Sequence, residues 1–207
     1  MKNILTSICL ALFIITASVT ITLNFRPLYY HDISALKIEE TSGFSRNTIR
    51  ENYDSLIDYN QFFHTKKLKL TIPMSKEGRI HFADVKHIFS VIEITCLITL
   101  VLCCFLIKKQ ISTKDFEFLK LTSVITILLP SIVGILTAIN WERVFIAFHE
   151  IVFRNDYWLF DEVKDPIIKI LPDTFFLHCA IMIICLILLG SVLCITFRSF
   201  FRHNFML

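Results

Sequence analysis

The sequence lacks the short motifs by which many catalytic centres are recognised. It contains no HExxH pair, no cysteines and histidines at metal-ligand spacing, no Gly-rich phosphate loop and no G-x-S-x-G segment. Only 4 of its 207 residues are glycine. These absences exclude a phosphate-binding loop and make both a metal site and a Ser/His/Asp hydrolase weak hypotheses.

The sequence also lacks a large excess of charge of either sign, and its polar segments lack cysteine. The formal net charge is +3, and the bases lie in loops that also carry acids, so a nucleic-acid partner is not expected. The polar loops contain no cysteine, so we expect no disulfide framework. The seven cysteines lie in apolar stretches, where we interpret them as small buried fillers. They are Cys9, Cys96, Cys103, Cys104, Cys179, Cys185 and Cys194.

Apolar residues make up 55% of the chain and include 20 phenylalanines, which predicts an integral membrane protein. Four stretches can cross about 30 Å of hydrocarbon as helices. The first exceeds the apolar core of a signal peptide, so we expect it to be retained. The predicted fold class is an all-α integral membrane protein with four transmembrane helices. Their residues are 1–25, 87–107, 118–139 and 175–197.

The distribution of basic residues predicts the orientation. The short segments 108–117 and 198–207 are basic, whereas segment 140–174 has four bases against seven acids. The positive-inside rule therefore places both termini, the 108–117 loop and the 198–207 tail in the cytoplasm. Segment 26–86 carries ten bases, but a segment of that length crosses largely regardless of charge. Segments 26–86 and 140–174 are expected outside the cytoplasm.

Segment 26–86 is predicted to form a small extracytoplasmic cap. Ser45 opens a helix whose apolar face is continued by Ile49 and Tyr53. Residues 67–72 alternate between polar and apolar side chains, which indicates a short strand or an extended strip. Residues 75–78 are predicted to turn the chain toward the second span.

Segment 140–174 is predicted to carry an amphipathic helix from Trp141 to Phe153. It is too polar for a fifth span and amphipathic enough to lie in the interface or to form a re-entrant helix. Two Asp/Pro pairs mark further helix starts. Asp165-Pro166 begins a short helix through Leu171, and Pro172-Asp173 begins the fourth span.

Two histidines in these outer segments are candidates for base catalysis. His149 lies on or beside the apolar face of the amphipathic helix, and His81 precedes the second span together with Asp84. Histidine accepts a proton near neutral pH, and a neighbouring carboxylate can fix its tautomer. Because no serine or cysteine nucleophile is evident, this chemistry suits acyl transfer in which a substrate group is the nucleophile.

Other interpretations of these polar residues stay open. An interfacial histidine is often a structural residue that reaches the headgroup region. His81 and His149 could bind a metal together with Asp84 and Asp156. Glu93, about two turns into the second span, is either functional or paired with a cation such as Lys86 or Arg143. A non-enzymatic lipoprotein-binding or transport accessory protein is the alternative from another class, and it does not need His81 and His149 close together.

Four blocks resemble, in order and approximate spacing, the bacterial lipoprotein intramolecular transacylase family. They are SRNTIRENYDSLIDY (residues 45–59), GRIHFADVK (78–86), FHEIVFRNDYW (148–158) and DPIIKILPDTFF (165–176). The resemblance covers nearly the whole chain, and the third block is its most specific part.

The resemblance implies an acyltransferase of the cell membrane of Gram-positive bacteria, acting at the outer leaflet on membrane-anchored lipoproteins. It would move the sn-2 acyl chain of an S-diacylglyceryl cysteine to the α-amino group of that cysteine, leaving the N-acyl S-monoacylglyceryl lyso form. The partners implied are the diacylglyceryl-modified N-terminus of a lipoprotein and membrane lipid. No cofactor and no metal is implied.

By resemblance, His149 and His81 match the motif histidines of the family, and we assign His149 as the base that deprotonates the ammonium group or the attacking amine. His81 matches the second histidine and is expected to relay a proton to the glycerol oxygen, oriented by Asp84. Three further residues are candidate donors for the oxyanion or contacts for the lipid headgroup, namely Arg154, Asn155 and Trp158. Asp156 is expected to orient the site or to act as a turn residue.

Overall fold

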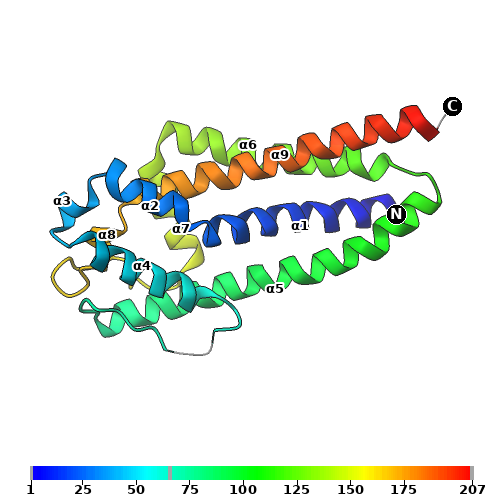
Figure 1. Cartoon of the computed structure of the whole chain (residues 1–207). Helices are drawn as coiled ribbons and strands as arrows, with labels where there is room; N and C mark the ends of the chain where they lie inside the picture. Colours follow the sequence, from blue (N-terminus) through cyan, green and yellow to red (C-terminus); the bar gives the residue numbers. More distant parts are fainter. Residues whose placement is uncertain (1, 65–66, 206–207) are drawn as a thin grey trace. The chain divides into compact units, whose positions relative to one another are not determined.

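The computed structural model describes residues 2–64 and 67–205, and every helix or strand assigned within them is an α-helix (Figure 1). Met1 and residues 206–207, which belong to the predicted first span and tail, lie outside the described residues. The helices are α1 (Lys2–Asn24), α2 (Arg26–Ala35), α3 (Ile38–Ser42), α4 (Arg46–Asn60), α5 (Lys76–Ser112), α6 (Glu117–Ile139), α7 (Trp141–Val152), α8 (Ile167–Ile170) and α9 (Asp173–Phe205). The all-α fold class is confirmed.

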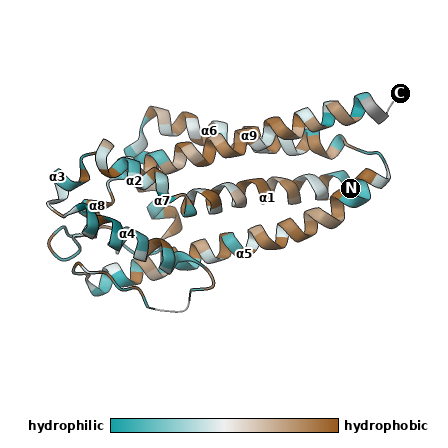
Figure 2. Ribbon diagram, in the orientation of Figure 1, coloured by the Kyte–Doolittle hydropathy of each residue, from teal (hydrophilic) through white to brown (hydrophobic). Residues whose placement is uncertain are grey.

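Four of these helices are long and apolar enough to cross a membrane, namely α1, α5, α6 and α9. Apolar residues occur along most of the length of these four helices, whereas α3 and α4 are largely hydrophilic (Figure 2). Helices α5 and α9 extend beyond the predicted spans 87–107 and 175–197 because their polar ends continue the same hydrogen-bonded helix. Hydropathy locates the apolar part of a helix and not its ends.

The predicted turn at residues 75–78 is wrong, because these residues begin α5. The hydroxyl of Ser75 accepts a hydrogen bond from the main-chain N–H of Gly78 at 2.9 Å, which is the geometry of a helix N-cap. Ser and Gly occur both in turns and at helix starts, so composition alone did not separate the two.

The chain divides into two compact units, the first of which comprises residues 1–22, 92–138 and 181–207. Small polar residues hold its helices together, as is usual where lipid offers no hydrophobic driving force between helices. The Ser7 hydroxyl on α1 donates to the main-chain oxygen of Phe118 on α6 at 2.9 Å. Ser123 on α6 and Ser191 on α9 each donate to the other's main-chain oxygen at 3.2 Å. All seven cysteines of the chain are free, but the interpretation as buried fillers holds only in part, because Cys104 and Cys185 are exposed.

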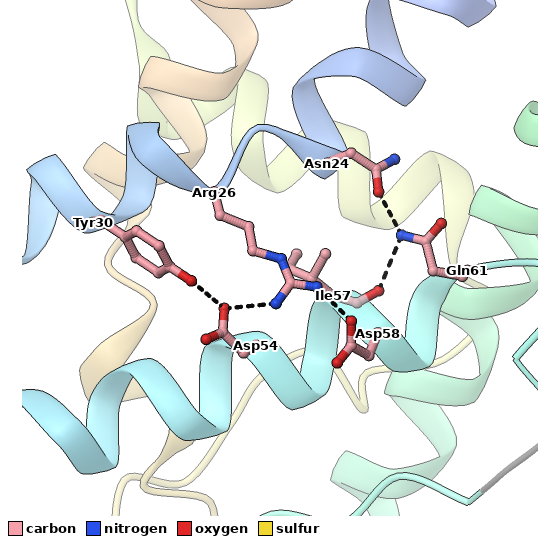
Figure 3. Close-up of polar contacts among 7 residues, drawn as sticks. All are labelled: Asn24, Arg26, Tyr30, Asp54, Ile57, Asp58 and Gln61. Atoms are coloured by element: carbon pink, nitrogen blue, oxygen red, sulfur yellow. Dashed lines mark hydrogen bonds and ion pairs between the residues drawn. The ribbon is translucent and has the colours of Figure 1, made fainter.

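The second unit comprises residues 23–91 and 139–180, which include α2, α3, α4, α7, α8 and the first residues of α5 and α9. Its helix α2 is tied to α4 by a polar network around Arg26 (Figure 3). The Arg26 guanidinium pairs with Asp54 at 2.9 Å and also with Asp58. The Tyr30 hydroxyl donates to the same Asp54 carboxylate at 2.7 Å. Sequence analysis did not identify α2, although Pro27 stands in its first turn.

Stacked tyrosines form the centre of the core of the second unit. The rings of Tyr29 on α2 and Tyr53 on α4 lie 3.7 Å apart, and the Tyr29 hydroxyl donates to the main-chain oxygen of Ile170 at 2.6 Å. Tyr53 is 3% exposed, so it is a core residue. Helix α4 begins as predicted, because Ser45 is its N-cap and accepts from the main-chain N–H of Thr48.

Residues 67–72 form no strand, although their burial follows the predicted alternation. Leu68 and Leu70 pack against the core and Ile72 is buried, while the intervening residues are exposed. The fully buried Asn52 holds this strip against α4. Its amide nitrogen donates to the Thr71 hydroxyl at 2.7 Å, and its amide oxygen accepts from the Thr71 main-chain N–H at 2.8 Å.

We expect Asn52→Ala to lower the free energy of unfolding by about 1–3 kcal/mol, because the Thr71 main-chain N–H loses the amide oxygen that accepts its hydrogen bond. The corresponding fall in Tm is about 2–12 °C, measured by thermal unfolding of the purified protein in detergent. Asn47→Ala, at an exposed position of the same helix, is the matched control. An equal Tm for the two variants would contradict the role assigned to Asn52.

Candidate active site

His81 lies in the second turn of α5 and is 6% exposed. Asp84 follows one helical turn later and is partly buried. Because residues three apart lie on the same side of a helix, both side chains belong to one face of the start of α5. The N-cap at Ser75 therefore determines where this pair is placed.

His149 lies in the last turn of α7, which begins as predicted at Trp141 and ends at Val152. The side chain of Asn140 caps the helix by accepting from the main-chain N–H of Arg143 at 2.9 Å. The other end is closed by a hydrogen bond from the main-chain N–H of Phe153 to the main-chain oxygen of His149 at 2.8 Å. His149 is partly buried, whereas Ile151 on another face is 83% exposed.

The two imidazoles meet within the second unit. Their ring centroids lie 6.2 Å apart with an interplanar angle of 28°. The residues are 68 positions apart in the sequence, so their meeting is a product of the fold. This distance agrees with the prediction that His81 and His149 lie close together, whereas the pocket open to the outer leaflet that the two were expected to face stays a prediction.

Aromatic side chains surround this histidine pair. His149 packs against Phe145 at 4.3 Å, Trp158 at 4.8 Å and Phe153 at 5.6 Å between ring centroids. Burial among these rings lowers the pKa of His149 below the ordinary value of 6.5, and a hydrogen bond to a main-chain oxygen opposes part of this shift. The ring is therefore predominantly neutral at pH 7, as a general base must be.

The hydrogen bond of His149 identifies its tautomer. Its Nδ1 lies 2.7 Å from the main-chain oxygen of Phe145, one turn earlier on α7. A carbonyl oxygen carries no proton, so Nδ1 is the donor and bears the hydrogen of the neutral ring. The lone pair of the neutral imidazole is consequently on Nε2. A main-chain carbonyl performs the orienting role that sequence analysis assigned to a neighbouring carboxylate.

The Nδ1 atom of His81 is buried and has no hydrogen-bond partner among residues 2–64 and 67–205. His81 is instead held by rings, with Phe153 at 4.7 Å and Phe160 at 5.3 Å between centroids. Asp84 forms its hydrogen bond with Asn155, whose amide nitrogen donates to it at 3.3 Å. The predicted orientation of His81 by Asp84 is therefore not made through Nδ1.

The other predicted site residues lie in the loop after α7. The Asn155 side chain also accepts from the main-chain N–H of Tyr157 at 3.0 Å, so this amide both shapes the loop and ties it to α5. Trp158 is partly buried against His149, whereas Arg154 and Asp156 are exposed. The main-chain oxygen of Asp156 accepts from the N–H of Leu159 at 3.1 Å, as in a turn.

Sequence analysis missed the phenylalanines that contact the histidines from outside α7. Phe153 contacts both imidazoles, and Phe160 contacts His81 and Phe82. Phe153 stands four residues after His149, which was the one available signal. Among 20 phenylalanines, no single one is distinguished without the fold.

A second His/Asp pair also escaped sequence analysis. In it, Nδ1 of His178 at the start of α9 lies 2.8 Å from the carboxylate of Asp32 on α2. Asp32 is 1% exposed, and the pair lies beside the tyrosine core. Nothing in the sequence connects two such distant residues.

Three further features bear on the open interpretations. Within the described part of the chain, no three His, Cys, Asp or Glu side chains are grouped so as to hold a metal ion, and this includes the histidine pair. A surface hollow of about 330 Å³ is lined by residues that include Arg26, Asp58 and Gln61, and it contains neither histidine of the pair. Glu93 is 5% exposed in the first unit, and its role stays a prediction.

Known proteins resemble this chain in sequence and in structure. The model of the lipoprotein intramolecular transacylase family matches residues 4–176. A solved structure of the membrane integral lipoprotein intramolecular transacylase from Bacillus cereus is 35% identical, with a TM-score of 0.96, over 98% of this chain and 95% of that chain. Structures of two variants of that protein, with one histidine changed to arginine or to alanine, have TM-scores of 0.88 at the same identity. They cover 91% and 93% of those chains and 98% of this one. No curated protein matches the chain.

A multi-pass membrane protein with paired imidazoles, matched by this family over most of its length and by a solved member over nearly all of it, is an acyltransferase. The chain belongs to the lipoprotein intramolecular transacylase family.

Proposed function

We propose that this enzyme moves the sn-2 acyl chain of an S-diacylglyceryl cysteine, at the N-terminus of a lipoprotein, to the α-amino group of that cysteine. The observation that carries the proposal is the hydrogen bond from Nδ1 of His149 to the main-chain oxygen of Phe145. This hydrogen bond leaves Nε2 as a proton acceptor. The ring of His149 lies beside a second imidazole, with 6.2 Å between the two ring centroids. The product is the N-acyl S-monoacylglyceryl lyso form.

His149 acts as the base in this mechanism. Its Nε2 takes a proton from the α-ammonium group, and the freed amine attacks the carbonyl carbon of the sn-2 ester. A carbon–nitrogen bond forms, and the bond between that carbon and the glycerol oxygen breaks. One amine proton leaves through the imidazole to solvent, and the second is transferred to the glycerol oxygen. Amine and ester belong to one molecule, so orientation supplies much of the acceleration.

His81 is assigned as the relay that delivers the second proton to the glycerol oxygen. Its position beside His149 and its Nδ1, which has no partner among the described residues, support this role. A buried nitrogen without a partner is costly in a folded protein, so such an atom at an active site is expected to bond to substrate.

Stabilisation of the oxyanion is assigned to donors in the loop after α7. Asn155 has a second amide hydrogen besides the one given to Asp84, and Trp158 carries an indole N–H on a ring that packs against His149. Arg154 is exposed and is assigned to the lipid headgroup. Asp156 is assigned to the turn that places Trp158. Donors of this kind stabilise charge that develops in the transition state.

The site is proposed to face the extracytoplasmic leaflet, with both termini in the cytoplasm. The bases of residues 108–114 and 198–202 support this orientation by the positive-inside rule. The acyl chains of the proposed substrate anchor it in the membrane. A site on a membrane protein can therefore bind the substrate while those chains stay in the bilayer. Neither a cofactor nor an external acyl donor is required, because the ester is already on the substrate.

We expect His149→Ala to lower the rate by about 100- to 10,000-fold, because the general base is lost. The protein is produced in a host that makes only diacylated lipoproteins, and N-terminal lipopeptides are analysed by mass spectrometry. Wild-type protein should give an acylated amine and a free glycerol hydroxyl. His87→Ala, an exposed histidine on α5, is the control and should retain activity. N-acyl product formed by well-folded His149→Ala at the wild-type rate would refute the assignment of the base.

The pH dependence follows from the lowered pKa of His149. The neutral, active form of the base persists below pH 6.5 and is lost only on further acidification. In purified enzyme, log kcat/KM, which reports the pKa of the base in the free enzyme, should rise with a slope of about 1 below this pKa and be level from there to pH 7. A rise in log kcat/KM that continues through pH 7 would contradict a pKa below 6.5 for the base.

A further inference from the structure

Gly78, in the first turn of α5, lies directly against a buried carboxylate. A Cβ atom on residue 78 would be 2.5 Å from Oδ1 of Asp165 and 3.1 Å from Cε1 of Phe160. The helix backbone is ordinary at this residue, so glycine is required here by close approach and not by its dihedral freedom. Gly78 and Asp165 belong to two of the sequence blocks singled out above, and neither has a place in the acyl-transfer steps.

Asp165 is 4% exposed and joins the start of α5 to the loop that follows α7. Its Oδ1 accepts the main-chain N–H of Ser75, the N-cap residue of α5, at 2.7 Å. The Ser75 hydroxyl in turn accepts the N–H of Gly78 at 2.9 Å. A carboxylate is favoured at a helix N-terminus, where free N–H groups and the helix dipole are both positive. This contact compensates for burying the charge of Asp165.

The same contact leads to His81. Phe160 comes from the loop that Asp165 closes, since the main-chain N–H of Asp165 donates to the main-chain oxygen of Asp161 at 2.7 Å. The Phe160 ring packs on His81 at 5.3 Å and on Phe82 at 5.5 Å. His81 stands three residues after Gly78, on the next turn of α5. Displacement of the carboxylate would therefore move both the helix that carries His81 and a ring that packs against it.

We propose that Asp165, seated against Gly78, is a positioning residue that holds His81 in its catalytic orientation. The inference rests on the function proposed above, in which His81 relays a proton. Nδ1 of His81 has no hydrogen-bond partner within the described residues, so ring packing, which includes Phe160, has to contribute to the orientation of this imidazole. Asp165 itself does not touch the reacting atoms in this scheme.

Asp165→Ala should lower kcat by about 100-fold, the loss typical of a catalytic group displaced by about 1 Å, with KM changed little. Asp165→Asn keeps the size and an acceptor oxygen, so it should restore most of the lost kcat. Asp161→Asn is the matched control, since this exposed side chain in the same loop caps only Val163 and Lys164. Rates are measured on purified enzyme with a synthetic diacylglyceryl lipopeptide, alongside Tm.

Two double variants separate positioning from a general loss of stability. In a His81→Ala background, Asp165→Ala should cost nothing further in kcat, because the group it positions is gone. Gly78→Ala should lower kcat in the wild-type background, where the new Cβ atom meets Oδ1 of Asp165. The same substitution should lower kcat by a smaller factor when it is added to Asp165→Ala, which removes that oxygen. If Asp165→Ala does not fold, Gly78→Ala alone decides the question, and a wild-type kcat for it overturns the proposal.

The results also distinguish this proposal from the one on which it rests. Wild-type kcat in folded Asp165→Ala, with activity still abolished by His149→Ala, would refute positioning by Asp165 and leave the acyl-transfer mechanism intact. Additive losses for Asp165→Ala and His81→Ala would also refute it. Full activity in His149→Ala would remove the mechanism itself.

Discussion

The hydrogen bond from Nδ1 of His149 to the main-chain oxygen of Phe145 is the interaction on which the site depends. It assigns the proton of the neutral ring to Nδ1 and leaves the lone pair on Nε2, the atom proposed to act as the base. Many histidine bases are oriented by a carboxylate, which would also add a negative charge. Here the partner is an uncharged carbonyl of the same helix, so the surroundings stay apolar and the pKa of His149 stays low.

The aromatic surroundings have a second consequence for the chemistry. A neutral imidazole in apolar surroundings is an available base, and charge that develops in the transition state meets few competing waters. The acyl chains of a lipid substrate are compatible with the same surface. The polar side chains near the histidine pair lie mainly in the loop after α7. There, Asn155 donates a hydrogen bond to Asp84 on α5, and the ring of Trp158 packs against His149. This division is compatible with the proposed function, in which one site accepts a lipid and moves protons.

The second unit supports this arrangement from several directions. Stacked Tyr29 and Tyr53 connect α2 to α4, and Asn52 fastens the irregular strip 67–72. The carboxylate of Asp165 against Gly78 fastens the start of α5. Buried polar groups that are fully bonded restrict the chain to one arrangement more sharply than apolar packing does. Positional accuracy at the histidine pair is therefore expected to depend on residues that never contact substrate.

The sequence by itself determined four apolar segments long enough to span a membrane, the start of the amphipathic helix at Trp141 and the cap at Ser45, because periodicity, apolar length and capping are local signals. The start of α5 was mistaken for a turn, and α2 and α3 were not identified, since their signals are short. Only the tertiary structure decided that His81 and His149 meet, that Phe153 and Phe160 join them, and that Asp84 bonds to Asn155. These contacts join residues far apart in the chain, and their formation depends on how the whole second unit packs, which no local pattern encodes.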